Sequence, residues 1–268
     1  LNHDHYDAPY DDFATQSLLP NRLSQLGPGV CWFDFDDDGD DDLVIGSGRE
    51  GNLAYFRNVD ANRFELATGV NDLGQLYRDL TTPLGFSLGK RRVCMIGVAS
   101  YENEDKAGNA FEVLDLQKPD RISRIGGVPE WNSSVGPMAA ADINGNGSLD
   151  LFVGGRNICG QYPLPATSRL YRYQDGAFYE DEQNNAVLKD IGLVSGAVFS
   201  DIEGDGDPDL ILALEWGPLT VLRNEEGKFF NATAELGLAN WTGWWNAVTA
   251  GDLNGDGRMD IVGVNWGQ

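Results

Sequence analysis

The chain has 268 residues, enough for one large domain or two smaller ones, and its 42 acidic and 19 basic residues give a formal net charge of −23. This acidity disfavours binding to nucleic acid, whose phosphates are also negative. No apolar run is long enough for a membrane-spanning helix, so we expect no membrane insertion.

Residues 1–28 show no regular strand or helix pattern, and we expect an irregular N-terminal lead. Its polar residues, among them His3, Asp7 and Asp12, favour a mobile terminus over a metal site. His3 and His5 are the only two histidines. A Ser–His or Cys–His nucleophile would have to recruit one of them, so the sequence disfavours that kind of catalysis.

A nine-residue frame begins at Asp34 and occurs four times, each copy followed by a short apolar run. Oxygen-bearing side chains stand at positions one, three, five and nine, and Gly stands at position six. The copies read DFDDDGDDD from Asp34, DINGNGSLD from Asp142, DIEGDGDPD from Asp201 and DLNGDGRMD from Asp252. The first copy has seven aspartates in nine residues. Because neighbouring carboxylates repel, we expect positive charge among them.

The spacing of this frame suits a hard divalent cation. Calcium takes six to eight oxygen ligands, and a Gly at position six permits a turn with positive φ. The EF-hand loop opens in the same way but closes with an acid at position twelve and enters a helix. Here the closing acid is at position nine and a strand-like run follows. We therefore predict four loops inside β-hairpins, with about four calcium ions as cofactors.

Each loop belongs to a unit of predicted strands. The first loop is followed by LVIGSG, LAYFRN and Phe64, the second by LFVGG, LYRYQD and Phe178, and the third by LILAL, LTVLRN and Phe229. The last unit, from Trp241, stops after its second strand. Thirty-four Gly and 11 Pro also suit an all-β protein with many turns.

The loops start 108, 59 and 51 residues apart, so the first gap spans two periods. We predict a degenerate unit there, in which 84–98 reads strand–turn–strand and Lys90, Arg91 and Arg92 replace the aspartates. Its other strands are expected at 111–116 and 122–125. An unrelated insertion is the alternative.

Four-stranded units of this length are typical of a β-propeller, which is the predicted all-β fold. The stretches GDLNGDGRMDIV and SDIEGDGDPDLIL resemble FG-GAP/VCBS repeats, which build integrin α-subunit headpieces and many secreted bacterial propellers. FRNVDANRF and TGWWNAVTAGDLNGDGRMDIVGVNWG resemble, more narrowly, bacterial ASPIC-type VCBS proteins. The resemblance covers residues 29–80 and 133–268. It implies blades with a calcium loop between their first and second strands.

We expect blades at 29–80, 81–130 (degenerate), 131–192, 193–240 and 241–268 (partial). About four and a half blades are fewer than single propellers usually contain. The sequence therefore favours part of a larger propeller that further blades complete.

The resemblance implies calcium ligands at positions one, three, five and nine, with the backbone carbonyl of position seven. Glu203 is one methylene longer than the usual Asp or Asn, so we expect a distorted third site. In chain order, positions one, three, five, seven and nine are Asp34, Asp36, Asp38, Asp40 and Asp42; Asp142, Asn144, Asn146, Ser148 and Asp150; Asp201, Glu203, Asp205, Asp207 and Asp209; and Asp252, Asn254, Asp256, Arg258 and Asp260.

Antiparallel strands would place the calcium loops on one face of the blades and the other connections on the opposite face. Six of the seven Trp fall at or near that opposite face. Exposed aromatic rings there suit stacking on a sugar or anchoring of a protein, whereas packing between blades is the alternative for each ring. The candidates for a ligand face are Trp131, Trp216, Trp241, Trp244 and Trp266.

Two functions follow from these features. The favoured one is a secreted calcium-binding module, extracellular, on the cell surface or periplasmic, that binds a protein or a glycan. The alternative is a carbohydrate-active lyase or hydrolase acting on the face without calcium. The sequence shows no recognisable catalytic constellation, so we do not expect an enzyme. Cys31, Cys94 and Cys159 are too widely spaced to suggest a disulfide framework or a zinc site, and the first two are expected to be buried.

Overall fold

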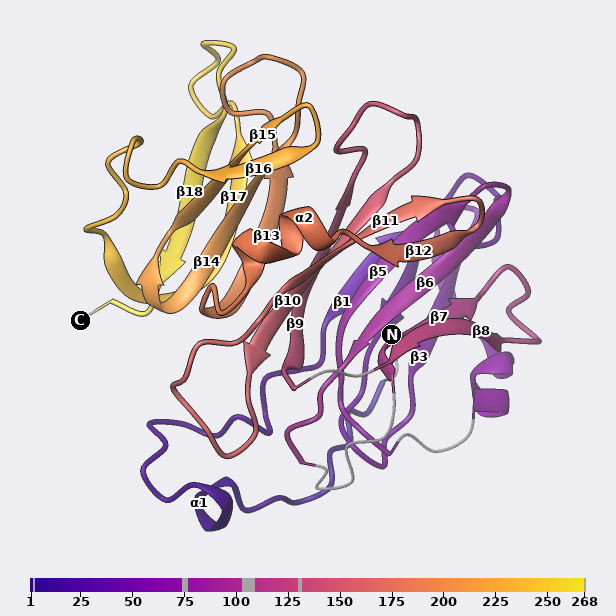
Figure 1. Ribbon diagram of the computed structural model, residues 1–268. Helices are drawn as coiled ribbons and strands as arrows, with labels where there is room; N and C mark the ends of the chain where they lie inside the picture. The colour runs from indigo at the N-terminus through magenta and orange to yellow at the C-terminus, as the bar shows by residue number, and fades with distance from the viewer. Residues whose placement is uncertain (2, 74–76, 103–108, 130–131, 268) are drawn as a thin grey trace. The chain divides into compact units, whose positions relative to one another are not determined.

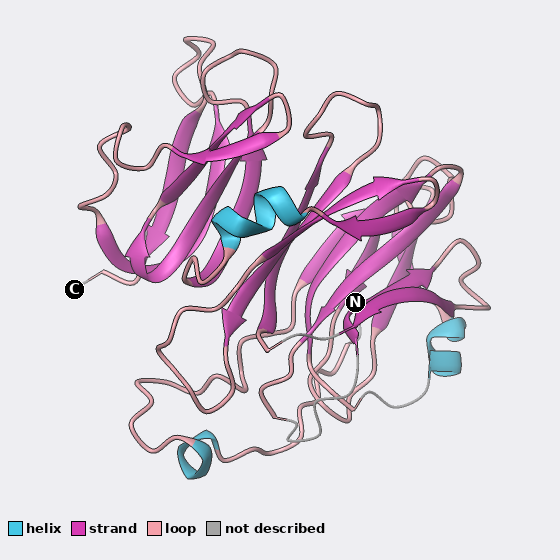
Figure 2. Cartoon of the chain, viewed as in Figure 1, coloured by secondary structure: helices cyan, strands magenta, loops and turns pink. Residues whose placement is uncertain are grey.

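The structure is a computed structural model that describes residues 1, 3–73, 77–102, 109–129 and 132–267. Strands dominate it, and the helices are few and short (Figure 2). The chain forms two compact units, Leu1–Val135 with Cys159–Tyr162 and Gly136–Ile158 with Pro163–Gln268. In the described part, no helix has the length and apolarity needed to cross a membrane.

The first unit holds two open, four-stranded antiparallel sheets whose strands follow chain order (Figure 1). The first sheet contains β1 (Val30–Phe33), β2 (Asp42–Ile45), β3 (Ala54–Val59) and β4 (Arg63–Leu66). The second contains β5 (Leu80–Leu88), β6 (Arg91–Val98), β7 (Asn109–Asp115) and β8 (Ser123–Pro129). A short helix, α1 (Asp12–Thr15), precedes them, and a 3-10 helix (Thr68–Leu73) lies between the sheets in sequence.

The second unit repeats the pattern and adds a hairpin. Its first sheet contains β9 (Ser134–Ala141), β10 (Asp150–Asn157), β11 (Arg169–Gln174) and β12 (Ala177–Glu180). After α2 (Glu182–Leu188) come β13 (Leu193–Ser200), β14 (Asp209–Pro218), β15 (Thr220–Glu225) and β16 (Lys228–Asn231). The hairpin of β17 (Thr242–Gly251) and β18 (Asp260–Asn265) joins this second sheet because β14 also pairs with β17.

Strands β1 and β5 lie side by side in the first unit, and β13 and β17 do so in the second. A Cβ atom on Gly85 of β5 would overlap the ring of Phe33 in β1, and one on Gly196 of β13 would come 2.9 Å from the Cα of Ala247 in β17. Only Gly permits so close an approach of the strands. All-β sheets of four antiparallel strands that meet in this way fit a propeller-like arrangement.

The cores lie within the units. Phe35, Tyr55, Cys94 and Leu116 are fully buried in one cluster of the first unit. The second unit has a comparable cluster, built from side chains of both of its sheets and of α2. The inner strands supply these clusters and are buried along most of their length, as in β10 and β14, which is expected where both faces of a sheet are covered. Cys94 is buried as predicted, whereas Cys31 is only partly buried.

The degenerate unit has the predicted strand–turn–strand form. β5 and β6 pair from Leu80 with Val98 to Leu88 with Arg91, so the hairpin turns at Gly89 and Lys90. The strand expected at 122–125 begins one residue later and is longer, because β8 pairs with β7 along most of its length.

The prediction of a mobile polar terminus is wrong for the described part of residues 1–28, which packs on the first unit. Asp12 is fully buried, and its Oδ1 accepts hydrogen bonds from the backbone N–H groups of Leu23 (2.7 Å) and Ser24 (2.8 Å). Ala8 and Leu23 are buried as well. These apolar residues are too widely spaced to produce a strand or helix pattern, so their packing could not be predicted from the sequence.

Candidate metal loops and an aromatic cluster

The aspartate at position one organises each loop through its own backbone. In the fourth loop, Asp252 accepts from the N–H groups of Gly255 (2.7 Å), Asp256 (3.1 Å) and Gly257 (2.9 Å). These bonds, that from Gly257 first, hold the pKa of Asp252 below its usual value. Asp34 and Asp201 accept from the same three positions, and Asp142 from two of them. All four loops therefore have one shape.

Left-handed backbone at positions four and six closes this shape. Position six has φ of 96° at Gly39 and 98° at Gly206. Position four also has positive φ, and there the first loop has Asp37 (67°) where the third has Gly204 (79°). Three loops have Gly at position four, a signal in the sequence that we did not use.

The carboxylate at position nine ties each hairpin together from inside. Asp42 and Asp209 are fully buried, as is Asp150. Asp209 accepts from the N–H of Ile202 at position two (3.0 Å) and from that of Asn224 on β15 (2.8 Å). Burial raises the pKa of all three carboxyls. In the fourth loop, the carboxylate of Asp260 likewise accepts the N–H of position two, Leu253, at 3.0 Å.

Position five turns toward position seven in every loop. Asp38, Asn146, Asp205 and Asp256 each accept, through one side-chain oxygen, the N–H of position seven at 2.8–3.1 Å. At position three, Asn144 and Asn254 accept the N–H of position five. The side-chain oxygens of positions one and five thus face the backbone inside each turn, as do those of Asn144 and Asn254, and the position-seven carbonyl stays a prediction.

The first loop offers the clearest fit for a cation. Asp34, Asp36 and Asp42 each place one oxygen within 4.8 Å of the others. Two ligands of one calcium ion, each about 2.3–2.6 Å away, are at most about 5 Å apart. The Oδ1 of Asp36 is buried and has no hydrogen-bond partner. An oxygen left in that state is costly unless a ligand satisfies it.

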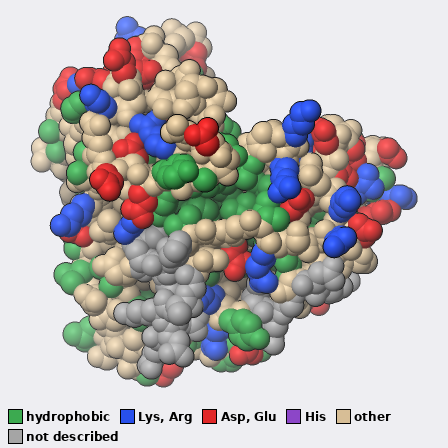
Figure 3. All heavy atoms as spheres, turned by 45° about the vertical axis from the view of Figure 1, so that its right-hand side comes forward, with side chains coloured by type: hydrophobic (Ala, Val, Ile, Leu, Met, Phe, Trp, Pro, Cys, Tyr) green, Lys and Arg blue, Asp and Glu red, His purple; other side chains and the backbone are tan. Residues whose placement is uncertain are grey.

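Arginines supply the expected positive charge. Arg57 of β3 bonds Asp36 and Asp38, Arg172 of β11 bonds Asp150 at 3.1 Å, and Arg223 of β15 lies 3.7 Å from Glu203. These three stand at equivalent strand positions, in FRN, YRY and LRN, but we did not predict their role. Arg92, at the start of β6 in the degenerate unit, contributes Nη1 at 3.1 Å from Asp34 Oδ2. Acidic and basic side chains are likewise interspersed on the face drawn in Figure 3.

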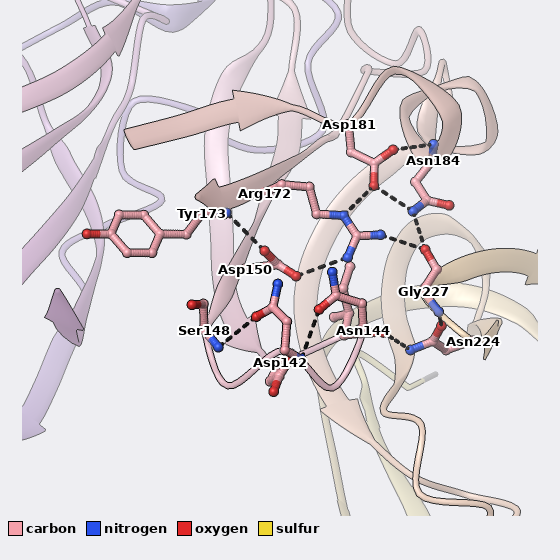
Figure 4. A network of polar contacts seen from close by, with 12 residues as sticks. Asp142, Asn144, Ser148, Asp150, Arg172, Tyr173, Asp181, Asn184, Asn224 and Gly227 are labelled. Atoms are coloured by element: carbon pink, nitrogen blue, oxygen red, sulfur yellow. Dashed lines mark hydrogen bonds and ion pairs between the residues drawn. The ribbon is translucent and has the colours of Figure 1, made fainter. Parts of the chain in front are cut away.

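Arg172 also links the second loop to the neighbouring sheet. Figure 4 shows its guanidinium between Asp150 and Asp181, donating to the carbonyl of Gly227 at 2.6 Å. The amide of Asn184 in α2 donates to the same carbonyl (2.9 Å). Asn224 donates to the carbonyl of Ile143, inside the loop (2.9 Å). Two strands therefore hold this loop directly, β11 through Arg172 and β15 through Asn224.

Three of the predicted ligand-face tryptophans form one group, here called the Trp cluster: Trp216, Trp244 and Trp266. The ring of Trp244 lies 4.8 Å from that of Trp216 and 5.5 Å from that of Trp266, between centroids. Trp216 is 54% exposed and Trp266 69% exposed. Aromatic rings in edge-on or tilted contact at these centroid distances attract one another, and such an arrangement leaves ring faces accessible to a ligand.

The Trp cluster lies at the strand ends away from the loops. β14 begins at Asp209, beside the third loop, and Trp216 lies seven residues along the strand, about 23 Å away at the usual rise. Glu215 and Trp216, which we expected in a connection, belong to β14 because this strand continues to Pro218.

The other tryptophans have separate places. Trp241 is 65% exposed, and its carbonyl accepts the Nε1–H of Trp245 at 3.1 Å. Trp245 covers Gly263 of β18, where a Cβ atom would come 2.9 Å from its ring. Packing therefore accounts for Trp245. Trp131 lies outside the described residues.

Comparisons with known proteins agree with the repeated loops. The family model of the FG-GAP-like repeat matches residues 142–212 and 201–263. No curated protein sequence matches the chain. The narrower resemblance to ASPIC-type VCBS proteins stays a prediction.

Comparison with solved structures finds similar chains at low sequence identity. A lectin of Agrocybe aegerita that recognises non-reducing terminal N-acetylglucosamine is 17% identical, with a TM-score of 0.51 over 90% of this chain and 61% of its own. The Vibrio cholerae biofilm matrix protein Bap1 is 18% identical (TM-score 0.47, 88% of this chain and 34% of its own). The rhamnogalacturonan lyase YesW is 10% identical (TM-score 0.48, 88% and 46%). The chain thus spans between about a third and three-fifths of these proteins.

Proposed function

Because residues 142–263 are FG-GAP-like repeats, we propose that this chain is a calcium-stabilised binding module that recognises a glycan or a protein through its Trp cluster. The loops serve as structural turns in this proposal, and the opposite strand ends form the ligand face. The proposal assigns no catalytic step to either region.

The observation that carries the proposal is that two exposed indole rings, those of Trp216 and Trp266, flank the partly buried ring of Trp244. Trp216 and Trp266 are each more than half exposed, although the ring of each lies against that of Trp244. Large aromatic side chains gathered on a surface provide much of the binding energy in many interfaces, and they suit stacking on the apolar face of a sugar ring. Because the similar lectin of Agrocybe aegerita recognises non-reducing terminal N-acetylglucosamine, glycans are the first class to test.

Calcium would be held by the side-chain oxygens at positions one, three, five and nine of each loop. Bound there, it supplies positive charge and links carboxylates that otherwise repel one another. The preformed bonds from position one and the buried oxygen of Asp36 support this assignment. A distorted third site at Glu203 remains part of the proposal.

The module is proposed to work outside the cytosol, on the cell surface, in the periplasm or in the extracellular space. Calcium sensors of the cytosol bind in the micromolar range, whereas extracellular modules bind in the range of about 10⁻⁴–10⁻³ M. Loops that bind at the weaker end of this scale are filled only where calcium is plentiful.

A binding screen in millimolar calcium tests the function. The purified chain is applied to immobilised glycans and secreted proteins, and every hit is measured again with Trp266→Ala. Trp32→Ala is the matched control, since Trp32 is a similarly exposed indole (53%) in the other unit. We expect Trp266→Ala to weaken binding about thirtyfold, the equivalent of about 2 kcal/mol, and Trp32→Ala to leave it unchanged.

Equal weakening by both variants, or hits that survive loss of Trp266, would contradict the assigned face. Cleavage of a glycan hit would instead support the alternative of a carbohydrate-active enzyme. A protein that binds wild type but not Trp266→Ala would support the binding module and would identify its partner as a protein.

A further inference from the structure

A second group of converging acids lies in the first unit, away from the loops. Asp7, Asp79 and Glu102 each place one carboxylate oxygen within 4.8 Å of the others. They come from the N-terminal lead, the residue before β5 and the connection after β6. Both strands have their shared turn at Gly89 and Lys90, so Asp79 and Glu102 lie at the opposite end of that hairpin.

Two oxygens of this group are buried and have no hydrogen-bond partner. They are Oδ1 of Asp7 and Oε1 of Glu102, whose side chain is only 4% exposed. Asp79 is 7% exposed as a residue. Burying carboxylate oxygens without partners costs several kcal/mol, so a bound group that satisfies both would stabilise this arrangement.

Arg49 neutralises only part of the charge. Its Nε lies 2.5 Å from Oε2 of Glu102, and its backbone N–H donates to Oδ1 of Asp79 at 2.6 Å. Nη1 of the same guanidinium is 3.7 Å from Glu50. One cation therefore faces three clustered carboxylates.

Space for a ligand is present beside the group. A cavity of about 240 Å³ is lined by Asp7 and Asp79, together with Ser24, Gln25 and Ser47. The chain packs closely around Asp7, because a Cβ atom added to Gly48 would come 2.5 Å from the Cβ atom of Asp7. Its neighbour Ala8 donates to the carbonyl of Arg49 at 3.0 Å.

From these contacts we propose that Asp7, Asp79 and Glu102 form a fifth divalent-cation site, distinct from the four loops, which fastens the N-terminal lead to the first two sheets. Three hard anionic oxygens select calcium or a cation like it over soft metals. The three oxygens lie within 4.8 Å of one another, close enough for one cation with metal–oxygen bonds of about 2.4 Å to contact all three.

Equilibrium dialysis against calcium tests the site by counting ions per chain. Asp7→Asn is the first variant, because it removes a carboxylate to which the structure gives no hydrogen bond. Glu102→Gln is the second. The matched control is Asp4→Asn, which makes the same charge change at an exposed residue of the same lead.

We expect both cluster variants to bind one ion fewer than the wild type, or to bind that ion at least tenfold more weakly, while Asp4→Asn keeps the full count. In wild type and Asp4→Asn, but not in the two cluster variants, Mn²⁺ should broaden the NMR amide signals of Ala8 and Arg49. In chelator, Asp7→Asn should melt no lower than wild type, since it relieves repulsion, and this establishes that the variant folds.

Unchanged ion number and affinity in both variants would overturn the fifth site, as would equal losses in Asp4→Asn. The result does not depend on the loops. If the loops bound nothing, the wild-type count would be one and would fall to zero in Asp7→Asn.

Discussion

Asp37 is the position-four residue that departs from the other loops. Its φ of 67° is left-handed, where Gly145, Gly204 and Gly255 stand in the other copies. A residue with a Cβ pays up to about 1–2 kcal/mol there, somewhat less for Asp. Asp37 has an exposed ion pair with Arg92, and such pairs contribute under about 1 kcal/mol.

We therefore expect Asp37→Gly to stabilise the chain by about 0.5–1 kcal/mol, by relieving this conformation and one of the repelling charges. Denaturant unfolding in calcium measures the change. Gly204→Asp is the mirror control, and it should cost a similar amount in the third loop. A less stable Asp37→Gly would show that the Arg92 contact outweighs the backbone term.

Single residues also mark what the sequence predicted and what it did not. Spacing alone indicated the oxygens of the loops, because a tight turn points alternate side chains inward. The strand arginines Arg57, Arg172 and Arg223 were not predicted, because a loop motif contains no information about the neighbouring strand whose side chains reach the loop. Asp7, Asp79 and Glu102 had no motif, because contacts between distant segments bring them together.

At the scale of elements, a buried ion pair joins β10 and β14. Nη2 of Arg156 is 2.5 Å from Oε2 of Glu215, and the side chains are 10% and 0% exposed. Removing one partner leaves the charge of the other buried without a counter-charge. By contrast, replacing both with apolar residues is often neutral.

Arg156→Met is expected to destabilise the chain by about 3–5 kcal/mol, and Arg156→Met with Glu215→Leu to recover most of that loss. Chemical unfolding of wild type, both single variants and the double variant gives the coupling. Additive losses in the double variant would mean that the pair is not the reason for the cost.

Most elements follow from patterns in the sequence. Apolar runs beside each loop predicted the hairpins, and the register of 34–42, in which Phe33 pairs with Asp42, recurs where Ser200 pairs with Asp209. Strand ends were less predictable. β14 extends through Trp216 because it pairs with both β13 and β17, which a local pattern does not reveal.

For the whole molecule, much of the negative charge lies in the loops that close its hairpins. Seventeen of the 42 acids lie in the four loops, and four divalent cations would bring the net charge from −23 to about −15. Without cations, repulsion inside each loop opposes folding. We expect the loops to act as separate stabilising turns, so that each filled site adds to the stability of its own hairpin.

Calcium in the loops is the central proposal at this scale, and thermal unfolding with and without a calcium chelator tests it most directly. It is best measured in Asp7→Asn as well as wild type, so that the proposed fifth site does not contribute. A site filled at about 100 times its Kd adds roughly 2.7 kcal/mol. Loss of two or more sites should therefore lower Tm by about 10 °C or more. We predict that drop in both chains, with recovery on adding calcium but little on adding magnesium. An unchanged melting curve in chelator would contradict the proposal that these loops hold calcium.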